Sequence, residues 1–138
     1  MIVAKRVIKV EWGDCDPAGI VYNPRYFDWF DSSTANLFAV LGVPKRQMLT
    51  EYASAGIPLV ETRATFMRPS KWGDEIVINT RFIEIRKSSF KVAHRLYNNN
   101  ELAVEGFETR VWVELDPFQG KLRSRPIPDD IVKKMQLE

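Results

Sequence analysis

Cysteine and histidine are almost absent from this sequence of 138 residues, which contains one of each, Cys15 and His94. A single cysteine excludes an internal disulfide bond. One cysteine and one histidine provide too few soft ligands for a zinc site, and the lone histidine and the lack of a G-x-S-x-G motif argue against a serine or cysteine triad. No Walker loop and no G-x-G-x-x-G motif occurs either. We therefore expect a chain that holds no metal ion and needs no cofactor.

Long hydrophobic runs and a strong excess of one charge are missing as well. The longest apolar runs, such as Leu37 to Val40, are far shorter than a bilayer span, and residues 1–12 lack the hydrophobic region and cleavage site of a signal peptide. Twenty basic and eighteen acidic side chains give a formal charge of +2, which is too small to indicate binding to nucleic acid or an anionic membrane. We expect a cytoplasmic protein that binds neither.

The composition is that of an ordinary soluble protein, with 45% hydrophobic and 28% charged residues. The length fits one substantial core, so we expect residues 1–138 to form a single domain. The order of patterns predicts an α+β domain in which a mainly antiparallel sheet wraps against a central helix. The expected strands are Val3 to Trp12, Leu59 to Arg68, Glu75 to Arg86, Ser89 to Tyr97 and Leu102 to Leu115, with a hairpin over residues 116–128, and the expected helices are Asn23 to Leu41, Lys45 to Ser54 and Asp129 to Gln136.

The long helix has a clear beginning and end. The Asn23 side chain is a typical N-cap, Pro24 suits the first helical position, and Gly42 and Pro44 follow the last turn. Its apolar residues share one face, which predicts packing against a broad surface; they are Phe27, Phe30, Thr34, Leu37, Phe38 and Leu41. Gly106, inside the last long strand, predicts a bulge or a close backbone approach.

Asp16 is the foremost candidate for a catalytic group. It lies between the first strand and the start of the long helix, where unpaired N–H groups and the positive end of the helix dipole would face a ligand. Those N–H groups could polarise a carbonyl oxygen while the carboxylate acts as nucleophile, or as base for water, without a histidine. The alternative is that Asp14 and Asp16 only shape the turn, which aspartate and glycine favour.

Asp31 is the second candidate, because it lies on the flank of the apolar helix face, where a carboxylate needs a partner. It could bind a polar group of a substrate, or a neighbouring strand or Arg63 could satisfy it within the protein. The only histidine, His94, alternates with apolar residues, which favours packing or pairing over catalysis. Without a nearby histidine, Cys15 is best interpreted as a small loop or core residue.

The segment VEWGDCDPAGIVYNPRYFDWFDSS, residues 10–33, resembles the signature segment of the 4-hydroxybenzoyl-CoA thioesterase family of hot-dog-fold proteins. The specific features are D-x-D-x-x-G-I-V-Y, followed directly by N-P-x-Y-x-x-W-x-D. The order of the expected elements agrees over nearly the whole chain. The resemblance implies a hot-dog fold, a long central helix wrapped by a curved antiparallel sheet, and homo-oligomers, dimers or tetramers, with active sites at the subunit interface.

The resemblance also implies a reaction, the hydrolysis of an acyl-CoA thioester, which is a small-molecule substrate. Asp16 matches the family's catalytic carboxylate. The backbone N–H of Asn23 matches the group that polarises the carbonyl, and Asp31 matches the position that receives a phenolic hydroxyl. The turn that would meet the nucleotide and phosphates of CoA consists of Arg86, Lys87, Ser88 and Ser89, whose positive charges and donors suit phosphate, although most such turns are merely solvated. We also expect Tyr22 to bind the substrate.

The acyl group stays open. The 4-hydroxybenzoyl-CoA enzyme carries a tryptophan near its acyl pocket, whereas GVPKRQM, residues 42–48, contains no aromatic residue. We expect an aromatic acyl-CoA similar to 4-hydroxybenzoyl-CoA. The alternatives are a broad short- or medium-chain acyl-CoA thioesterase, in which Asp31 only contacts protein, and a noncatalytic protein that binds CoA or an acyl ligand. Another hot-dog branch places its acid on the helix, where Asp28 or Asp31 would serve, but the loop motif argues against this. A hot-dog dehydratase is disfavoured because His94 lies on a strand.

Overall fold

The computed structural model describes all 138 residues and contains one main sheet, a small hairpin and three α-helices. The elements are, in order, β1 (Ala4–Lys9), the 3-10 turn η1 (Trp12–Asp14), α1 (Asn23–Val40), α2 (Lys45–Glu51), β2 (Leu59–Phe66), β3 (Glu75–Ile85), β4 (Ser89–Asn98), β5 (Glu101–Val111), β6 (Val113–Leu115), β7 (Leu122–Ser124) and α3 (Asp129–Met135).

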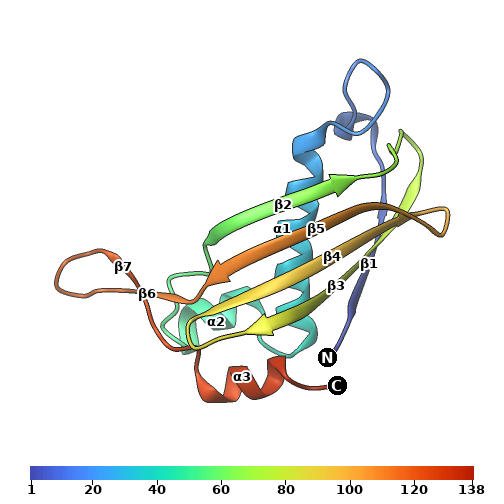
Figure 1. Cartoon of the computed structure of the whole chain (residues 1–138). Helices are drawn as coiled ribbons and strands as arrows, with labels where there is room; N and C mark the ends of the chain where they lie inside the picture. Colours follow the sequence, from blue (N-terminus) through green and yellow to red (C-terminus); the bar gives the residue numbers. More distant parts are fainter.

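The main sheet is antiparallel throughout, with the strand order β1-β3-β4-β5-β2. The edges are therefore β1 and β2. Helix α1 crosses one face of the sheet, and α2 and α3 lie near the C-terminal end of α1 (Figure 1). The hairpin of β6 and β7 projects to the side. The two termini lie together, since the N–H of Ile2 donates to the carbonyl of Leu137 at 3.1 Å. This arrangement confirms the predicted α+β architecture.

The buried face of α1 is broader than the predicted stripe. Phe30, Thr34, Leu37 and Phe38 are buried as expected, and the helix also buries Tyr26, Trp29 and Ser33. The edge strand β1 covers this flank: the Arg6 guanidinium donates to the Ser33 hydroxyl at 3.1 Å and to the Trp29 carbonyl at 3.3 Å. None of the helices is both long and apolar enough to cross a membrane.

Aromatic side chains tie α1 to the centre of the sheet. Phe38 of α1, Phe82 of β3 and Phe90 of β4 pack edge to face, with ring centroids 5.2 to 5.6 Å apart. Each pair of this kind contributes roughly 0.5–1.5 kcal/mol beyond the burial of its area. The three rings belong to the larger of two buried clusters, which fixes the C-terminal half of α1 against the sheet.

The ring of Phe30 on α1 lies directly against Gly106 of β5. A Cβ atom at this position would lie 2.5 Å from Cε2 of Phe30, far inside van der Waals contact. The element that approaches Gly106 is therefore a side chain and not a backbone, and the predicted bulge is absent, because no register shift of β5 occurs at Gly106 in its pairing with β2 or β4. The missing side chain lets the Phe30 ring lie on the strand and stack on His94, with centroids 4.7 Å apart.

Three local predictions differ from the structure. The first strand ends at Lys9, because the Asp14 carboxylate accepts the N–H of Glu11 at 2.8 Å and closes the turn η1. The expected strand from Leu102 to Leu115 is divided into β5 and β6, because Ser89, the first residue of β4, pairs with Val111, and the chain beyond it turns to pair with residues 122–124. The N-cap of α1 is Tyr22, and no side chain caps the helix, so the predicted capping role of the Asn23 side chain is wrong.

Candidate active site

The loop between η1 and α1 is a closed turn that projects from the end of the molecule. Cys15 and Val21 form an isolated antiparallel bridge, the N–H of Asp16 donates to the Ile20 carbonyl at 2.9 Å, and the N–H of Gly19 donates to the Asp16 carbonyl at 2.9 Å. Gly19 has a φ of +83°, a left-handed conformation that disfavours other residues. These contacts fix residues 15–21 relative to the start of α1.

Asp14 holds this loop in place. Its carboxylate accepts the N–H of Glu11 and lies 3.2 Å from Nε of Arg25, while its carbonyl accepts the N–H of Tyr22 at 2.8 Å. Both oxygens and the backbone are thus used for structure. The turn-forming interpretation therefore applies to Asp14.

Asp16 has a different environment, because only part of its carboxylate is used. Oδ1 accepts the N–H of Ala18 at 2.9 Å, which is an Asx turn. Oδ2 accepts no hydrogen bond from the protein, and no lysine or arginine lies within ion-pair distance of the half-buried side chain. One oxygen of Asp16 shapes the loop, and the other remains free for a ligand or a water molecule.

The first turn of α1 offers an unpaired donor beside this loop. The N–H of Asn23 donates to no acceptor in the protein, Pro24 has no N–H, and the N–H of Arg25 donates to the Tyr22 carbonyl at 2.8 Å. The Asn23 N–H also lies at the positive end of the helix dipole. It is therefore suited to polarise a carbonyl oxygen, whereas the exposed Asn23 side chain makes no hydrogen bond.

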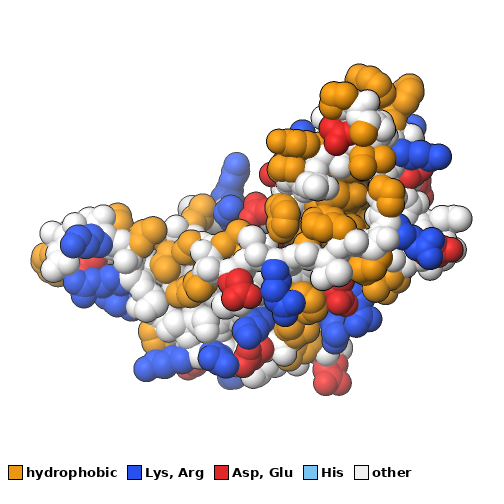
Figure 2. All heavy atoms as spheres, turned by 45° about the horizontal axis from the view of Figure 1, so that its top comes forward, with side chains coloured by type: hydrophobic (Ala, Val, Ile, Leu, Met, Phe, Trp, Pro, Cys, Tyr) orange, Lys and Arg blue, Asp and Glu red, His pale blue; other side chains and the backbone are white.

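A cleft of about 210 Å³ opens at this end of the molecule. It combines the loop, the start of α1 and the end of β2, and its lining residues are Ile20, Val21, Asn23, Tyr26, Phe66, Met67, Arg68 and Pro69. The loop is attached to the segment before β3, because the N–H of Val21 donates to the Ser70 carbonyl at 2.8 Å. Hydrophobic side chains gather on one end of the molecule (Figure 2). Trp12, Tyr22 and Trp72 are exposed in the segments that adjoin this loop, and the rings of Trp12 and Trp72 are in contact, with centroids 5.3 Å apart.

Asp31 lies elsewhere, two turns further along α1 and about 12 Å from Asn23 along the helix axis. Its Oδ1 accepts a hydrogen bond from Nη2 of Arg110 at 2.7 Å. Asp31 is thus bound from a neighbouring strand, β5, which was one of the two expected possibilities. The other, Arg63, lies 3.6 Å from Glu61 and over the ring of Phe107. The structure therefore does not bring Asp16 and Asp31 together within one chain.

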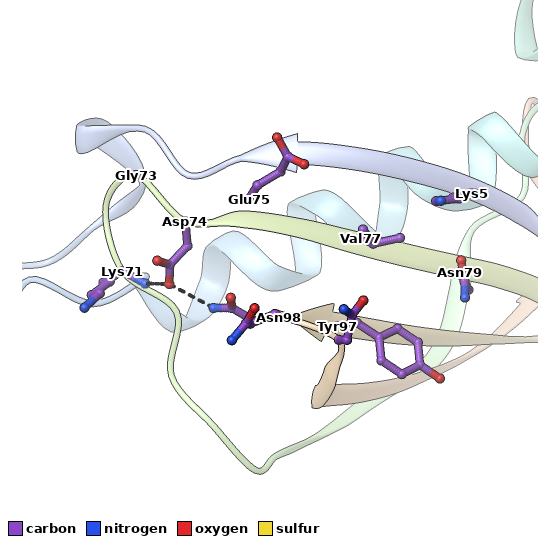
Figure 3. Close-up of a pocket in the computed structure, with 11 residues that line it drawn as sticks. Lys5, Lys71, Gly73, Asp74, Glu75, Val77, Asn79, Tyr97 and Asn98 are labelled. Carbon is purple, nitrogen blue, oxygen red and sulfur yellow. Dashed lines mark hydrogen bonds between the residues drawn. The ribbon is translucent and has the colours of Figure 1, made fainter.

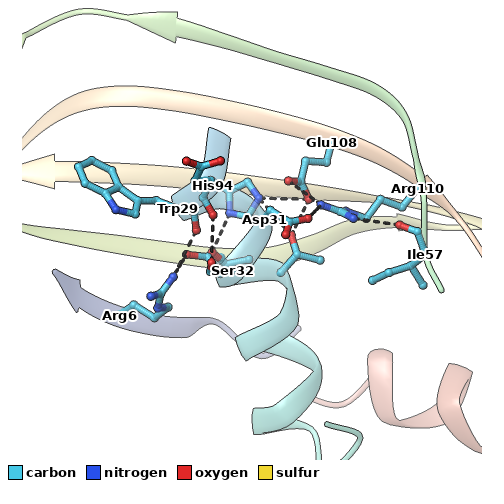
Figure 4. Close-up of polar contacts among 12 residues, drawn as sticks. Arg6, Trp29, Asp31, Ser32, Ile57, His94, Glu108 and Arg110 are labelled. Carbon is cyan, nitrogen blue, oxygen red and sulfur yellow. Dashed lines mark hydrogen bonds and ion pairs between the residues drawn. The ribbon is translucent and has the colours of Figure 1, made fainter. Parts of the chain in front are cut away.

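Arg110 belongs to a buried polar network beneath α1 (Figure 4). Its guanidinium binds Glu108, whose carboxylate also accepts the Thr34 hydroxyl at 2.5 Å and lies 3.4 Å from Nε2 of His94. Burial would raise the pKa of Glu108, but the hydrogen bonds and charges of His94 and Arg110 outweigh it and lower the pKa to about 2. His94 is thus a packed and paired residue, as its surroundings in the sequence predict.

Sequence reasoning missed Glu108 and Arg110, although a signal was present. Gly106, Glu108, Arg110 and Trp112 follow one another at period two and all face the core. An acid and a base on the inner face of a strand indicate a buried pair, because isolated charges are not buried.

The predicted phosphate-binding turn lies at the other end of the sheet. Strand β3, with its eleven residues, runs from the end of the sheet near the Asp16 loop to this turn, a distance of about 35 Å. The Arg86 guanidinium bonds Glu84 at 2.9 Å, Lys87 is exposed, and the turn backbone is tied to Trp112 and Ile127. This turn does not meet the Asp16 loop within one chain.

A larger pocket of about 980 Å³ contains none of the predicted site residues. It lies on the sheet face opposite α1, since Lys5, Val77, Asn79 and Tyr97 alternate with core residues along β1, β3 and β4 (Figure 3). At its rim the Asp74 carboxylate accepts the Lys71 N–H at 2.9 Å and the Asn98 amide at 2.8 Å. Its polar contacts are internal, and it offers no group comparable to Asp16 and the Asn23 N–H.

Comparison with known proteins places this geometry in a family. A family model described as the thioesterase-like superfamily matches residues 10–135. The 4-hydroxybenzoyl-CoA thioesterase of Pseudomonas sp. (strain CBS-3) is 33% identical over an alignment of 131 residues, which covers 91% of this chain and 92% of that protein.

Two solved structures agree in fold. A mutant 4-hydroxybenzoyl-CoA thioesterase complexed with 4-hydroxybenzoyl-CoA matches with a TM-score of 0.90 and 30% identity, over 97% of this chain and 99% of that one. A gentisyl-coenzyme A thioesterase matches with a TM-score of 0.84 and 30% identity, over 94% of this chain and 99% of the other. The chain therefore belongs to the thioesterase-like superfamily of hot-dog-fold proteins and is an acyl-CoA thioester hydrolase.

Proposed function

We propose that this protein hydrolyses an aromatic acyl-CoA similar to 4-hydroxybenzoyl-CoA, with the Asp16 carboxylate as nucleophile or general base. The observation that carries this proposal is the pairing of a carboxylate with a free oxygen and an unpaired helix N–H at the two ends of one fixed loop. The N–H of Asn23 would donate a hydrogen bond to the thioester carbonyl oxygen. Asp16 would then either attack the carbonyl carbon, so that the CoA thiolate leaves and water hydrolyses the resulting anhydride, or remove a proton from an attacking water. A thioester is sufficiently activated for this, so no metal or cofactor is required.

An aromatic acyl group is supported by the relatives. The two solved structures described above are thioesterases named for 4-hydroxybenzoyl-CoA and for gentisyl-coenzyme A, and both of these acyl groups carry phenolic hydroxyls. Asp31 would accept such a hydroxyl through Oδ2, because its Oδ1 is bonded to Arg110. The exposed Tyr22 would line the entrance, and Arg86, Lys87, Ser88 and Ser89 would bind the nucleotide and phosphates of CoA.

A homodimer would bring these parts together. Within one chain, Asp31 is further from the Asn23 N–H than the para hydroxyl of a hydroxybenzoyl group is from its carbonyl oxygen. The predicted phosphate-binding turn is also at the far end of β3. Strand β2 is an exposed edge with unpaired backbone groups, and pairing two copies antiparallel along it would place opposite ends of the two chains side by side. We therefore place each active site between two protomers.

The second candidate is a thioesterase that accepts short- and medium-chain acyl groups broadly. It is favoured by the ion pair of Asp31 with Arg110, which satisfies part of the carboxylate inside the protein. In this case Asp31 would have a structural role only, and the acyl pocket would select by size.

Hydrolysis of 4-hydroxybenzoyl-CoA, benzoyl-CoA and hexanoyl-CoA by the purified protein distinguishes the two candidates. Release of the CoA thiol is followed, and kcat/KM is compared across the three substrates. We expect 4-hydroxybenzoyl-CoA to exceed each of the others by at least about 10-fold, the value of one hydrogen bond to a charged group. Equal kcat/KM for the hydroxybenzoyl and hexanoyl esters would contradict the aromatic assignment.

A further inference from the structure

His94, Glu108, Arg110 and Asp31 follow one another in a chain of polar contacts (Figure 4), and of these four only Asp31 has an exposed side chain. The side chains of His94, Glu108 and Arg110 are 0%, 2% and 6% exposed, whereas that of Asp31 is 57% exposed. Buried ion pairs contribute little to stability, because apolar side chains of similar volume are often at least as stabilising. We therefore expect the function of this network at its exposed member, Asp31.

Arg110 is held rigidly from several sides. Its Nε donates to Oε1 of Glu108 at 2.9 Å, its Nη2 donates to Oε2 of the same carboxylate at 3.1 Å, and its Nη1 donates to the Ile57 carbonyl at 2.9 Å. A planar guanidinium bound in this bidentate way has a fixed direction. The remaining bond, from Nη2 to Asp31, therefore points along a line that the core determines.

Glu108 is held in the same way from the side of α1 and β4. It accepts the Thr34 hydroxyl at 2.5 Å, and His94 is fixed between Glu108 and the Thr80 hydroxyl, which lies 2.8 Å from its Nδ1. The pKa of Arg110 would be lowered by burial, but the bonds to Glu108 and Asp31 raise it. Glu108 and Arg110 together thus form a permanent, neutral pair.

For Asp31 this pair has two consequences. A half-exposed aspartate on a helix surface would otherwise sample several rotamers, and the bond to Arg110 selects one. The bond to Arg110 occupies only Oδ1, and Oδ2 of Asp31 has no partner in the protein.

We propose that Arg110 is a positioning residue that orients Asp31 to recognise a hydroxyl on the acyl group of the substrate. This inference rests on the proposed function and adds to it: selectivity for hydroxylated acyl groups is built into the core of the sheet. Arg110 acts through Asp31 and does not itself contact the substrate.

The test is a double-mutant cycle on Arg110→Lys and Asp31→Asn. The measured quantity is the ratio of kcat/KM for 4-hydroxybenzoyl-CoA to that for benzoyl-CoA, which a general loss of stability does not change. We expect each single variant to lower this ratio by about 10-fold. We expect the double variant to lower it no further than Asp31→Asn alone, because both changes remove the same interaction.

One variant serves as the control. Arg95→Lys changes a half-exposed arginine that pairs with Glu105 on the same sheet at 3.3 Å. It should retain the wild-type ratio. If Arg110→Lys does not fold, Glu108→Gln replaces it, since it loosens the hold on Arg110 and should lower the ratio in the same direction.

A wild-type ratio in Arg110→Lys, or losses that multiply in the double variant, would overturn the proposal. Failure of the proposed function is distinguishable from this. If the wild type hydrolyses neither ester, the same cycle is measured as Kd for non-hydrolysable thioether analogues of the two esters. A preference for the hydroxylated analogue that both variants abolish supports the role of Arg110, and the absence of any preference in the wild type refutes it.

Discussion

At the scale of single residues, a carboxylate can serve structure and chemistry together because it has two oxygens. Asp16 uses Oδ1 to close its own turn, and Asp31 uses Oδ1 to bind Arg110. Asp14, which has the same side chain in the same loop, uses its carboxylate for Glu11 and Arg25. The difference between a structural and a candidate functional aspartate is thus how many lone pairs the protein itself occupies.

Glu108 makes the stability of the protein depend on pH. Its pKa of about 2 in the folded chain lies below its ordinary value of 4.5, so the folded state binds the proton less readily than the unfolded state. The resulting stabilisation, on the order of 3 kcal/mol, is complete above the ordinary pKa and is lost as the pH falls toward the folded one. We expect the free energy of unfolding in urea to fall across this window.

Other carboxylates also titrate in that range, so the comparison is with Glu108→Gln. The difference in unfolding free energy between wild type and this variant should shrink as the pH falls from 4.5 to 2. Glu105→Gln, on the outward side of the same strand, is the control and should show a constant difference. A constant difference for Glu108→Gln as well would mean that the carboxylate is not held charged by His94 and Arg110.

The loop residues could be predicted from the sequence, but the network could not. Asp16, Gly19 and Asn23 follow one another closely, so turn chemistry and helix-end chemistry indicate their roles. Arg110 lies 79 positions after Asp31, and pairing at that separation depends on the register of β5 under α1. Of the two expected possibilities, a neighbouring strand is confirmed by Arg110 of β5. Arg63 is wrong, since it has the right charge but lies on the edge strand β2.

At the scale of elements, periodicity predicted most of the fold. The helix from Asn23 and the strands from Leu59, Glu75 and Ser89 are found within a few residues of their expected bounds, because a helix face and an alternating strand leave clear patterns. The single strand expected up to Leu115 is wrong because its end depends on where β4 begins. The C-terminal end of β5 is therefore determined by the neighbouring strand β4 and not by the sequence of β5 itself.

Strand β2 carries the prediction about assembly. All of its residues are exposed except the half-buried Ala64, and Val60 is 66% exposed. If two copies pair along this edge, Val60→Glu places a charge in the contact from each protomer. We expect this variant to sediment as a folded monomer and to lose thioester hydrolysis, because each active site would need both chains.

The opposite edge of the sheet provides the matched control. Val7 of β1 is 56% exposed on the other edge strand, so Val7→Glu adds the same charge to a similar surface. It should leave both the sedimentation and the rate unchanged. A wild-type protein that is active as a monomer would contradict the shared site.

At the scale of the whole molecule, the candidate parts are distributed over the length of the sheet. The Asp16 loop lies at one end, the turn of residues 86–89 at the other, and Asp31 between them on α1. The motif in residues 10–33 could be recognised in the sequence, but the separation of its parts could be seen only in the fold. This separation is the reason we propose that two protomers share each active site.

The central claim is that the Asp16 carboxylate carries the hydrolysis, and one measurement tests it most directly. CoA release from 4-hydroxybenzoyl-CoA is compared for wild type, Asp16→Asn and Asp14→Asn. Asparagine can still accept the Ala18 N–H, so the loop should keep its shape. We predict that Asp16→Asn lowers kcat by about 10²-fold or more, whereas Asp14→Asn, which only loosens the loop, has a much smaller effect. A wild-type kcat in Asp16→Asn would contradict the account.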